Sequence, residues 1–423
     1  MDKKTSALTF DGIILFFVLV LANLRALIFV FLYPDTSVFL GPAWIEIAFW
    51  LLAALGVMYI LIRDDRIADY LLAWRRNWTL GLFVLLALIS AFWSLGFVVT
   101  LFRASELLFA TLIASYIGMR YSPAQLMTVI FWFGAILAIL SIALVLGAPK
   151  AGTMYWAPFN GAWRGVYWHR NHLGSVMALV NIVYFYRAIM AVERRDKVGY
   201  LDAFFYILSL VVLYFAESAT GYILFILLHF FVICVWLWMK TFHLLQKRHY
   251  YVIFAVLAGG LILILSNLDV VFGLFNRSST LTGRVYLWDY LLKNAIPQRL
   301  WWGHGFGAAW TFESFREDAR LHIGWTSPPL IADNGFLDIL LHVGVVGLTI
   351  FVSVLMIASV RAFRYAISRK MLADFFPLLI MFYAFVANIS FSLFAETEVF
   401  VWFLIVAVLF MITPPFLKKK SSA

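Results

Sequence analysis

Charged residues are scarce in this sequence. Asp, Glu, Lys and Arg make up only 13% of the 423 residues, whereas 64% are apolar and 18% are aromatic. A soluble domain carries about 25% charged residues and about 45–50% apolar ones. A mean hydropathy of +0.94 excludes soluble enzymes and DNA-binding domains. The composition predicts an all-α integral membrane protein that forms one polytopic domain over residues 1–423.

Cysteine and metal-site motifs are also lacking. The one cysteine, Cys234, lies in the apolar run FFVICVWLW, which excludes an internal disulfide and predicts a small core residue. The sequence shows no His/Cys spacing of a metal site, no nucleophile elbow and no phosphate-binding P-loop. We therefore expect no metal ion, no cofactor and no nucleic-acid partner.

Long apolar runs are what the sequence has in abundance. A transmembrane helix needs about 20 apolar residues to cross about 30 Å of hydrocarbon. About twelve runs suit this: 8–32, 44–62, 80–97, 98–117, 126–146, 172–191, 201–215, 221–239, 251–268, 336–360, 376–393 and 399–412.

The basic residues predict the orientation of these spans. The net charge of +10 comes from 32 Lys+Arg against 22 Asp+Glu, and short cytoplasmic loops of membrane proteins are enriched in Lys and Arg. With twelve spans, all the basic clusters fall on one side: Lys3–Lys4, Arg63–Arg66, Arg75–Arg76, Arg194–Lys197, Lys240–Arg248, Arg361–Lys370 and Lys418–Lys420. Both termini are then cytoplasmic.

One large extracytoplasmic loop, residues 269–335, is predicted between spans nine and ten. It carries six basic and six acidic side chains and five tryptophans. Long loops in compact folds are usually functional. A second, shorter external loop covers residues 147–170.

The large loop opens with SSTLTGRVYLWDYLLKN, whose apolar spacing predicts a helix at the membrane surface. Such a helix would hold Arg284 near the headgroups, where a guanidinium can bind phosphate through two hydrogen bonds. The alternative is that Arg284 only caps the helix or pairs locally, for example with Asp289.

The next segment, PQRLWWGHGFGAAW, contains three glycines that allow a tight turn. Its backbone amides either face an anion or only form a plain turn. The tryptophans of this segment suit a membrane-interface belt and equally suit stacking on sugar rings.

The loop ends at Asp333 and Asn334, at the mouth of the tenth span. Within that span, Asp338 and His342 are four residues apart and share one helix face. Ionisable groups at this depth are costly, so the pair is either functional or a buried structural pair. Further polar groups expected inside the membrane are Arg25, Arg103, Glu106, Glu217, His229, Asn388, Glu396 and Glu398.

Six segments together resemble the O-antigen ligase/polymerase family of bacterial surface polysaccharide assembly. They occur in the family's order and cover residues 80–348, in a style closest to exopolysaccharide polymerases. The segments are LISAFWSL, WHRNHLGSVMAL, ESATG, LTGRVYLW, GHGFGAAW and ADNGFLDILLHVGVVGL.

The resemblance implies a GT-C-like fold in the bacterial inner membrane and glycosyl transfer without metal on the extracytoplasmic face. The donor would be a glycan on undecaprenyl diphosphate and the acceptor a sugar hydroxyl, with membrane lipids and other polysaccharide assembly proteins as further partners. Arg284 would stabilise the diphosphate leaving group and Asp333 would act as the base. The expected substrate-binding residues are Arg164, Arg170, Asn171, Ser218, Arg277, His304 and Asn334.

Two positions depart from the family pattern. Ligases of the family have a His-Asn pair where this chain has Asp333-Asn334, and a basic residue is common where this chain has Ala219. Both differences favour a polymerase over a lipid A ligase. A ligase-type transfer, a lipid-linked sugar flippase and an inactive assembly subunit stay as alternatives.

Overall fold

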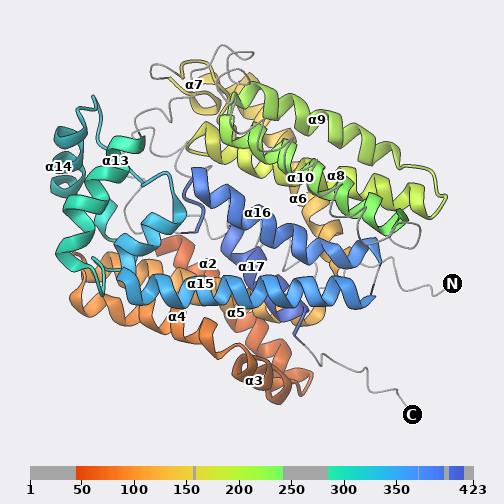
Figure 1. Cartoon of the computed structure of the whole chain (residues 1–423), viewed down its shortest axis with the longest axis horizontal. Coiled ribbons are helices and arrows are strands. Elements are labelled where there is room, and N and C mark those ends of the chain that lie inside the picture. The colour runs from red at the N-terminus through yellow and green to blue at the C-terminus, as the bar shows by residue number, and fades with distance from the viewer. Residues whose placement is uncertain (1–43, 156–158, 242–283, 370, 395–399, 414–423) are drawn as a thin grey trace.

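The computed structural model describes residues 44–155, 159–241, 284–369, 371–394 and 400–413. In these residues the regular elements are helices, and there is no β-strand (Figure 1). One isolated β-bridge joins Thr153 and Trp163. The helices are α2 (Trp44–Arg63), α3 (Ile67–Arg76), α4 (Trp78–Ile89), α5 (Phe97–Arg120), α6 (Pro123–Gly147), α7 (Pro149–Gly152), α8 (Arg170–Glu193), α9 (Tyr200–Ala216), α10 (Ala219–Thr241), α13 (Arg284–Tyr290), α14 (Glu313–Ile323), α15 (Gly335–Arg369), α16 (Phe376–Ser390) and α17 (Phe400–Met411).

The apolar runs do form helices. Six described helices are long and apolar enough to cross a membrane, or seven when α2 and α3, bent by 117°, count as one span. The shorter apolar helices α4, α9 and α17 match further predicted runs. The runs 8–32 and 251–268 lie outside the described residues. An all-α membrane protein is therefore confirmed, while the count of twelve spans stays a prediction.

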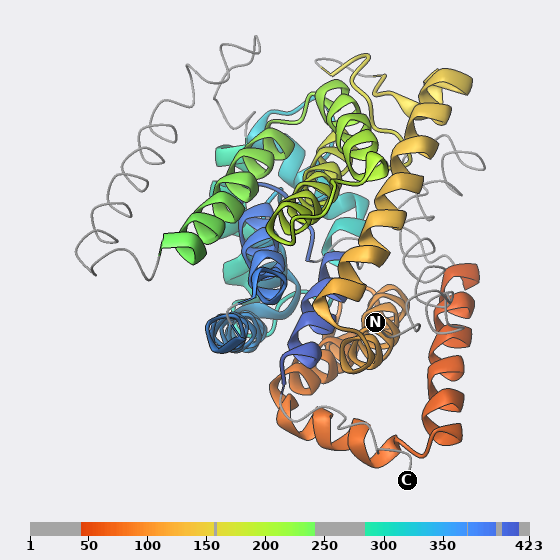
Figure 2. The same ribbon diagram turned by 90° about the vertical axis from the view of Figure 1, so that its right-hand side faces the viewer.

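Helix α17 forms the centre of the bundle, where Figure 2 shows it in deep blue. All its residues from Phe400 to Phe410 are buried, and it packs against α5, α15 and α16. A helix that is apolar all round is typical of a protein core or of a membrane span. Its one polar group, the indole N–H of Trp402, donates to Thr111 Oγ1 at 2.8 Å.

Helix α8 packs against α9 and α10. Its first turns approach α10 very closely, because a Cβ placed on Gly221 would lie 2.8 Å from the carbonyl carbon of Gly174. Small residues allow such close contact between membrane helices. The glycine pair therefore brings the beginnings of α8 and α10 together.

Helix α15 is broken near its beginning. Gly344 has a φ of 67°, which interrupts the helical hydrogen bonds. The freed groups bond to the segment before α14: the amide of His304 donates to the Leu341 carbonyl at 2.9 Å, and the amide of Val345 donates to the Leu300 carbonyl at 2.9 Å. Irregular backbone at membrane depth is tolerated only where protein satisfies it in this way.

The hydrogen bonds between the loop and α15 also involve the glycine-rich segment of the loop. Gly303, Gly305 and Gly307 all have positive φ, and the amide of Gly305 donates to the His342 carbonyl at 3.0 Å. A Cβ on Gly303 would lie 2.4 Å from the backbone of His342. The segment is thus a structural turn that joins the loop to α15.

Three long helices begin at the same end of the bundle, which α13 and α14 cover (Figure 1). The beginnings of α8, α10 and α15 meet there, through contacts described below. Their opposite ends carry basic residues, namely Arg194 after α8, Lys240 in α10 and Arg369 in α15. The described part of the chain therefore separates a polar, loop-covered end from a basic end.

Candidate functional site

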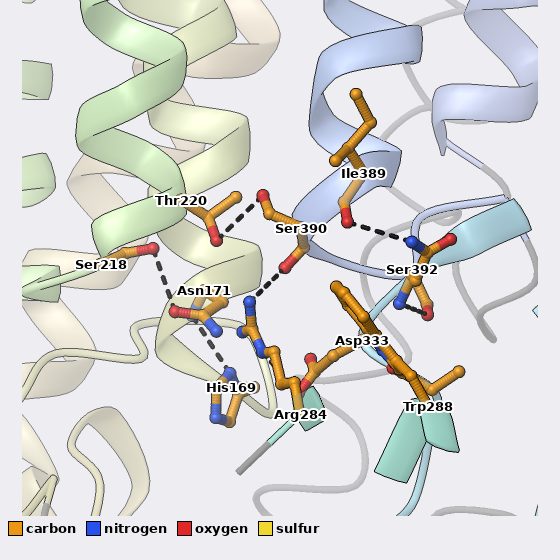
Figure 3. Close-up of polar contacts among 12 residues, drawn as sticks. His169, Asn171, Ser218, Thr220, Arg284, Trp288, Asp333, Ile389, Ser390 and Ser392 are labelled. Carbon is orange, nitrogen blue, oxygen red and sulfur yellow. Dashed lines mark hydrogen bonds and ion pairs between the residues drawn. The ribbon is translucent and has the colours of Figure 1, made fainter. Parts of the chain in front are cut away.

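Polar side chains converge where the beginnings of α8, α10, α13 and α15 meet the end of α16. Figure 3 shows this cluster, which includes His169, Asn171, Ser218, Arg284 and Asp333. These residues come from four segments that lie far apart in the sequence. Their convergence makes this cluster the candidate functional site.

Arg284, the first residue of α13, lies at the centre of the cluster with its side chain only 10% exposed. Its Nε donates to Asp333 Oδ2 at 3.1 Å, and its Nη1 donates to the carbonyl oxygen of Ser390 at 2.7 Å. Within the described residues, no hydrogen bond engages Nη2. Two hydrogen bonds thus fix the guanidinium in its orientation.

Arg284 does not pair with Asp289, the local partner that the sequence suggested. Asp289, five residues further on, forms an ion pair with Lys293 at 2.6 Å instead. Arg284 pairs with Asp333, which only the tertiary structure brings near. The indole N–H of Trp288, one turn along α13, donates to the Ala332 carbonyl at 2.7 Å and ties the helix to the segment before Asp333.

Asp333 is held in an unusual backbone conformation, with a φ of 53°. A non-glycine residue in this region costs energy and persists only where its neighbours are fixed. Asn334 provides this fixation, since its side-chain oxygen accepts from the amides of Phe336 at 3.0 Å and Leu337 at 3.1 Å and so caps α15. Its own amide donates to Ser392 Oγ at 3.0 Å. Asn334 therefore positions Asp333 and anchors α15 to the turn that follows α16.

The beginning of α8 supplies the opposite wall of the cluster. Asn171 Oδ1 accepts from Ser218 Oγ at 3.1 Å, and Ser218 Oγ accepts from the amide of Gly221 at 3.1 Å. Asn171 and Ser218, from two separate sequence segments, are thus in direct contact. Thr220 extends the link, because Ser390 Oγ lies 3.3 Å from its hydroxyl.

Two further predicted arginines lie on this side. The Nη1 of Arg170 donates to the Glu217 carbonyl, and its guanidinium lies 4.0 Å from the centre of the Phe159 ring. Arg164 Nε donates to the Ala151 carbonyl at 2.9 Å, and burial lowers the pKa of its guanidinium. Both are buried, so their charges act in a region with little water.

His169 is the residue that the sequence prediction missed. Its Nδ1 accepts from the amide of Asn171 at 3.2 Å, which caps α8. Burial holds the pKa of the imidazole well below its ordinary value of 6.5, and the charges of Arg170 and Arg284 lower it further. The predicted run began only at residue 172, and histidine is not among the usual cap residues, so no local signal marked His169 as the cap.

Two predicted residues are not part of the described cluster. Arg277 lies outside the described residues. His304 is buried in the loop, with Nε2 3.0 Å from the Ala295 carbonyl, and burial lowers its pKa. No contact in the described part of the chain joins His304 to Arg284 or Asp333.

Three of the polar groups expected inside the membrane, Asp338, Arg103 and Glu106, have structural partners. The carboxylate of Asp338 accepts from the indole N–H of Trp310 at 2.6 Å and from the amide of Ala332, so it does not need His342 as a partner. Arg103 and Glu106 form an ion pair with each other, at 3.3 Å. Arg25, Glu396 and Glu398 lie outside the described residues.

The three tryptophans of the glycine-rich segment divide into two groups. Trp310 is buried beside Asp338, whereas Trp301 and Trp302 are 61% and 53% exposed. The exposed pair suits a membrane interface or a sugar. Among the described residues, no three His, Cys, Asp or Glu side chains form a group that could hold a metal ion.

Comparison with known proteins agrees with the sequence motifs. The O-antigen ligase family model matches residues 204–352, which include Ser218, Arg284 and Asp333. The chain is 26% identical over 288 residues to the exopolysaccharide production protein ExoQ of Rhizobium meliloti (strain 1021). That match covers 65% of this chain and 63% of the relative, so the chain spans less than two thirds of the relative's length. The predicted resemblance is confirmed.

Proposed function

We propose that this chain, an O-antigen ligase/polymerase-family protein, is a polysaccharide polymerase of the bacterial inner membrane. The family match and the exopolysaccharide-production relative support a polysaccharide assembly enzyme. In the proposed reaction, a glycan on undecaprenyl diphosphate is transferred to a sugar hydroxyl of the next lipid-linked repeat unit.

One observation carries the proposal, which is the setting of Arg284. Its guanidinium is fixed by Asp333 and Ser390, and Nη2 has no hydrogen bond within the described residues. A buried arginine that is already oriented stabilises developing negative charge more strongly than a mobile one. The leaving group of the proposed reaction, a diphosphate, develops such charge.

The chemistry then divides between two side chains. The acceptor hydroxyl oxygen attacks the anomeric carbon of the donor, and its proton passes to the carboxylate of Asp333. The bond between that carbon and the phosphate oxygen breaks, and undecaprenyl diphosphate leaves with the electron pair. Arg284 holds the leaving oxygens, with Arg164 and Arg170 as further positive charges nearby. In this scheme the positive charge comes from arginines, so that no metal ion is required.

The arrangement of the helices supports an extracytoplasmic site. Helices α8, α10 and α15 begin at the site and carry basic residues at their other ends. Since basic residues favour the cytoplasmic side, the site would face outward and both termini would be cytoplasmic in a protein of twelve spans.

A ligase-type transfer is the second candidate, because the matching family model is described as an O-antigen ligase. Asp333 in place of histidine, and Ala219 in place of a basic residue, favour the polymerase. The two reactions share the donor and the leaving group, and they differ in the acceptor.

The test is reconstitution of the purified protein in liposomes with a lipid-linked repeat unit as the sole substrate. Long chains would support the polymerase. Transfer that occurs once, and only when a second acceptor is added, would support the ligase. Movement of the lipid between leaflets without a new glycosidic bond would overturn both and indicate a flippase. Arg284→Ala in the same liposomes is the negative control, because any product formed by this variant does not depend on Arg284.

A further inference from the structure

The side chain of His169 has a defined hydrogen-bonding state. Its Nδ1 accepts from the amide of Asn171 at 3.2 Å, so this nitrogen carries no proton. A neutral imidazole with an acceptor at Nδ1 has its hydrogen on Nε2. His169 therefore presents an N–H donor, and its basic nitrogen is already occupied by the backbone of α8.

The surroundings keep this imidazole neutral. The groups whose charges act on it are Arg164, Arg170, His172 and Arg284, and all of them disfavour a proton. Together with burial they hold the pKa of His169 well below 6.5. At neutral pH the ring is thus an uncharged donor among cations.

The ring is also fixed in orientation. It stacks on Phe391 with the ring centres 6.0 Å apart, and it lies 5.1 Å from the ring of Trp168. Figure 3 shows it at the beginning of α8, below Asn171, and the charge of Arg284 acts on it. A rigid donor of this kind needs no reorganisation when a charged oxygen arrives.

We propose that His169 contacts the donor substrate directly, donating a hydrogen bond from Nε2 to a diphosphate oxygen of the lipid that Arg284 holds. This role rests on the proposed function. It excludes His169 as the base that deprotonates the acceptor, because Nδ1 caps α8 and Nε2 already bears a hydrogen. A neutral donor also adds a hydrogen bond without repelling Arg284, which a protonated histidine would do.

Two substitutions separate the possible roles. Asn at position 169 keeps an oxygen that can cap α8, since Asn is a favoured cap, but it does not reach as far as Nε2. Gln places an amide N–H close to the position of Nε2. We expect His169→Asn to slow glycan transfer about 100-fold, in the range for one lost oxyanion donor. His169→Gln should keep its transfer rate within about tenfold of the wild type, and His169→Asn, which keeps the cap, should melt close to the wild type.

Each other outcome overturns the proposal. Near-normal transfer by His169→Asn would mean that the residue only caps α8. Equal loss in both variants would mean that an imidazole is needed for more than donation. An acidic limb near pH 6.5 in the wild-type rate that disappears in His169→Gln would mean that the histidine titrates during catalysis.

Binding of undecaprenyl diphosphate to the full-length protein in detergent gives a readout besides activity. We expect His169→Asn to bind this lipid about tenfold more weakly than the wild type, and Arg284→Ala to bind more weakly still. If the wild type does not bind it, the proposed function fails. If Arg284→Ala weakens binding and His169→Asn does not, only the role of His169 fails.

Discussion

Replacing Arg284 by lysine keeps a positive charge at the site and removes the planar guanidinium. In the structure this group makes two fixed hydrogen bonds, to Asp333 at 3.1 Å and to the Ser390 carbonyl at 2.7 Å. A lysine ammonium is a compact point charge that cannot reproduce the geometry of the fork. Arg284→Lys therefore tests whether geometry, and not charge alone, supports the transfer.

The expected loss follows from the number of contacts. A hydrogen bond to a charged group contributes about 1.5–3 kcal/mol. We assume that the lysine ammonium keeps the ion pair with Asp333 and loses one hydrogen bond to the substrate. The rate of glycan transfer then falls about 10- to 100-fold, at about 1.4 kcal/mol per factor of ten. Arg284→Ala loses every contact and leaves Asp333 without its partner, so we expect a fall of about 1000-fold.

The assay is the initial rate of glycan transfer in liposomes, normalised to the amount of folded protein. Arg187→Lys is a matched control, because Arg187 also pairs through Nε with an aspartate, Asp202 at 2.7 Å, between α8 and α9. It should stay within about twofold of the wild-type rate. A wild-type rate for Arg284→Lys, or an equal loss in Arg187→Lys, would refute the reasoning.

Three further substitutions test other parts of the structure. Asp333→Asn keeps an oxygen for Arg284 but removes the proton acceptor, so transfer should fall at least about 100-fold while undecaprenyl diphosphate still binds; a normal rate would show that the base lies elsewhere. Gly221→Ala would put a Cβ 2.8 Å from Gly174, so we expect a lower melting temperature and little transfer, and an unchanged melting temperature would contradict the close contact. Arg361→Leu removes three hydrogen bonds at the basic end of the bundle; thermal unfolding should show a loss of about 1–3 kcal/mol, with transfer per folded molecule unchanged.

The sequence predicted the helices well, because lipid as solvent makes apolar length a direct signal. Ten of the twelve predicted runs coincide with described helices. The break in α15 had no such signal. HVGVVGL reads as continuous apolar helix, and only the loop segment that bonds to Leu341 and Val345 makes the positive φ of Gly344 favourable.

The sequence predicted residues of the site but not which of them form hydrogen bonds with one another. Arg284, Asp333, Asn171 and Ser218 were all expected to be functional, and the structure brings them into one cluster. Their partners could not be derived, because Arg284 and Asp333 are 49 positions apart, and local spacing favoured Asp289. The role of His169 depends on three arginines from two different segments, which no local pattern contains.

The positive charge of the candidate site comes from groups that keep it across the neutral pH range. Arginines stay protonated, and the beginnings of α8, α10 and α15 each add about half an elementary charge from their backbone dipoles. His169 adds a hydrogen bond without adding charge. Further basic residues, in contrast, lie at the other ends of these helices. If the leaving diphosphate is held by these fixed charges, only the base that accepts the proton has to change its protonation during a cycle. A single carboxylate, Asp333, is then sufficient for the acid–base part of the proposed reaction.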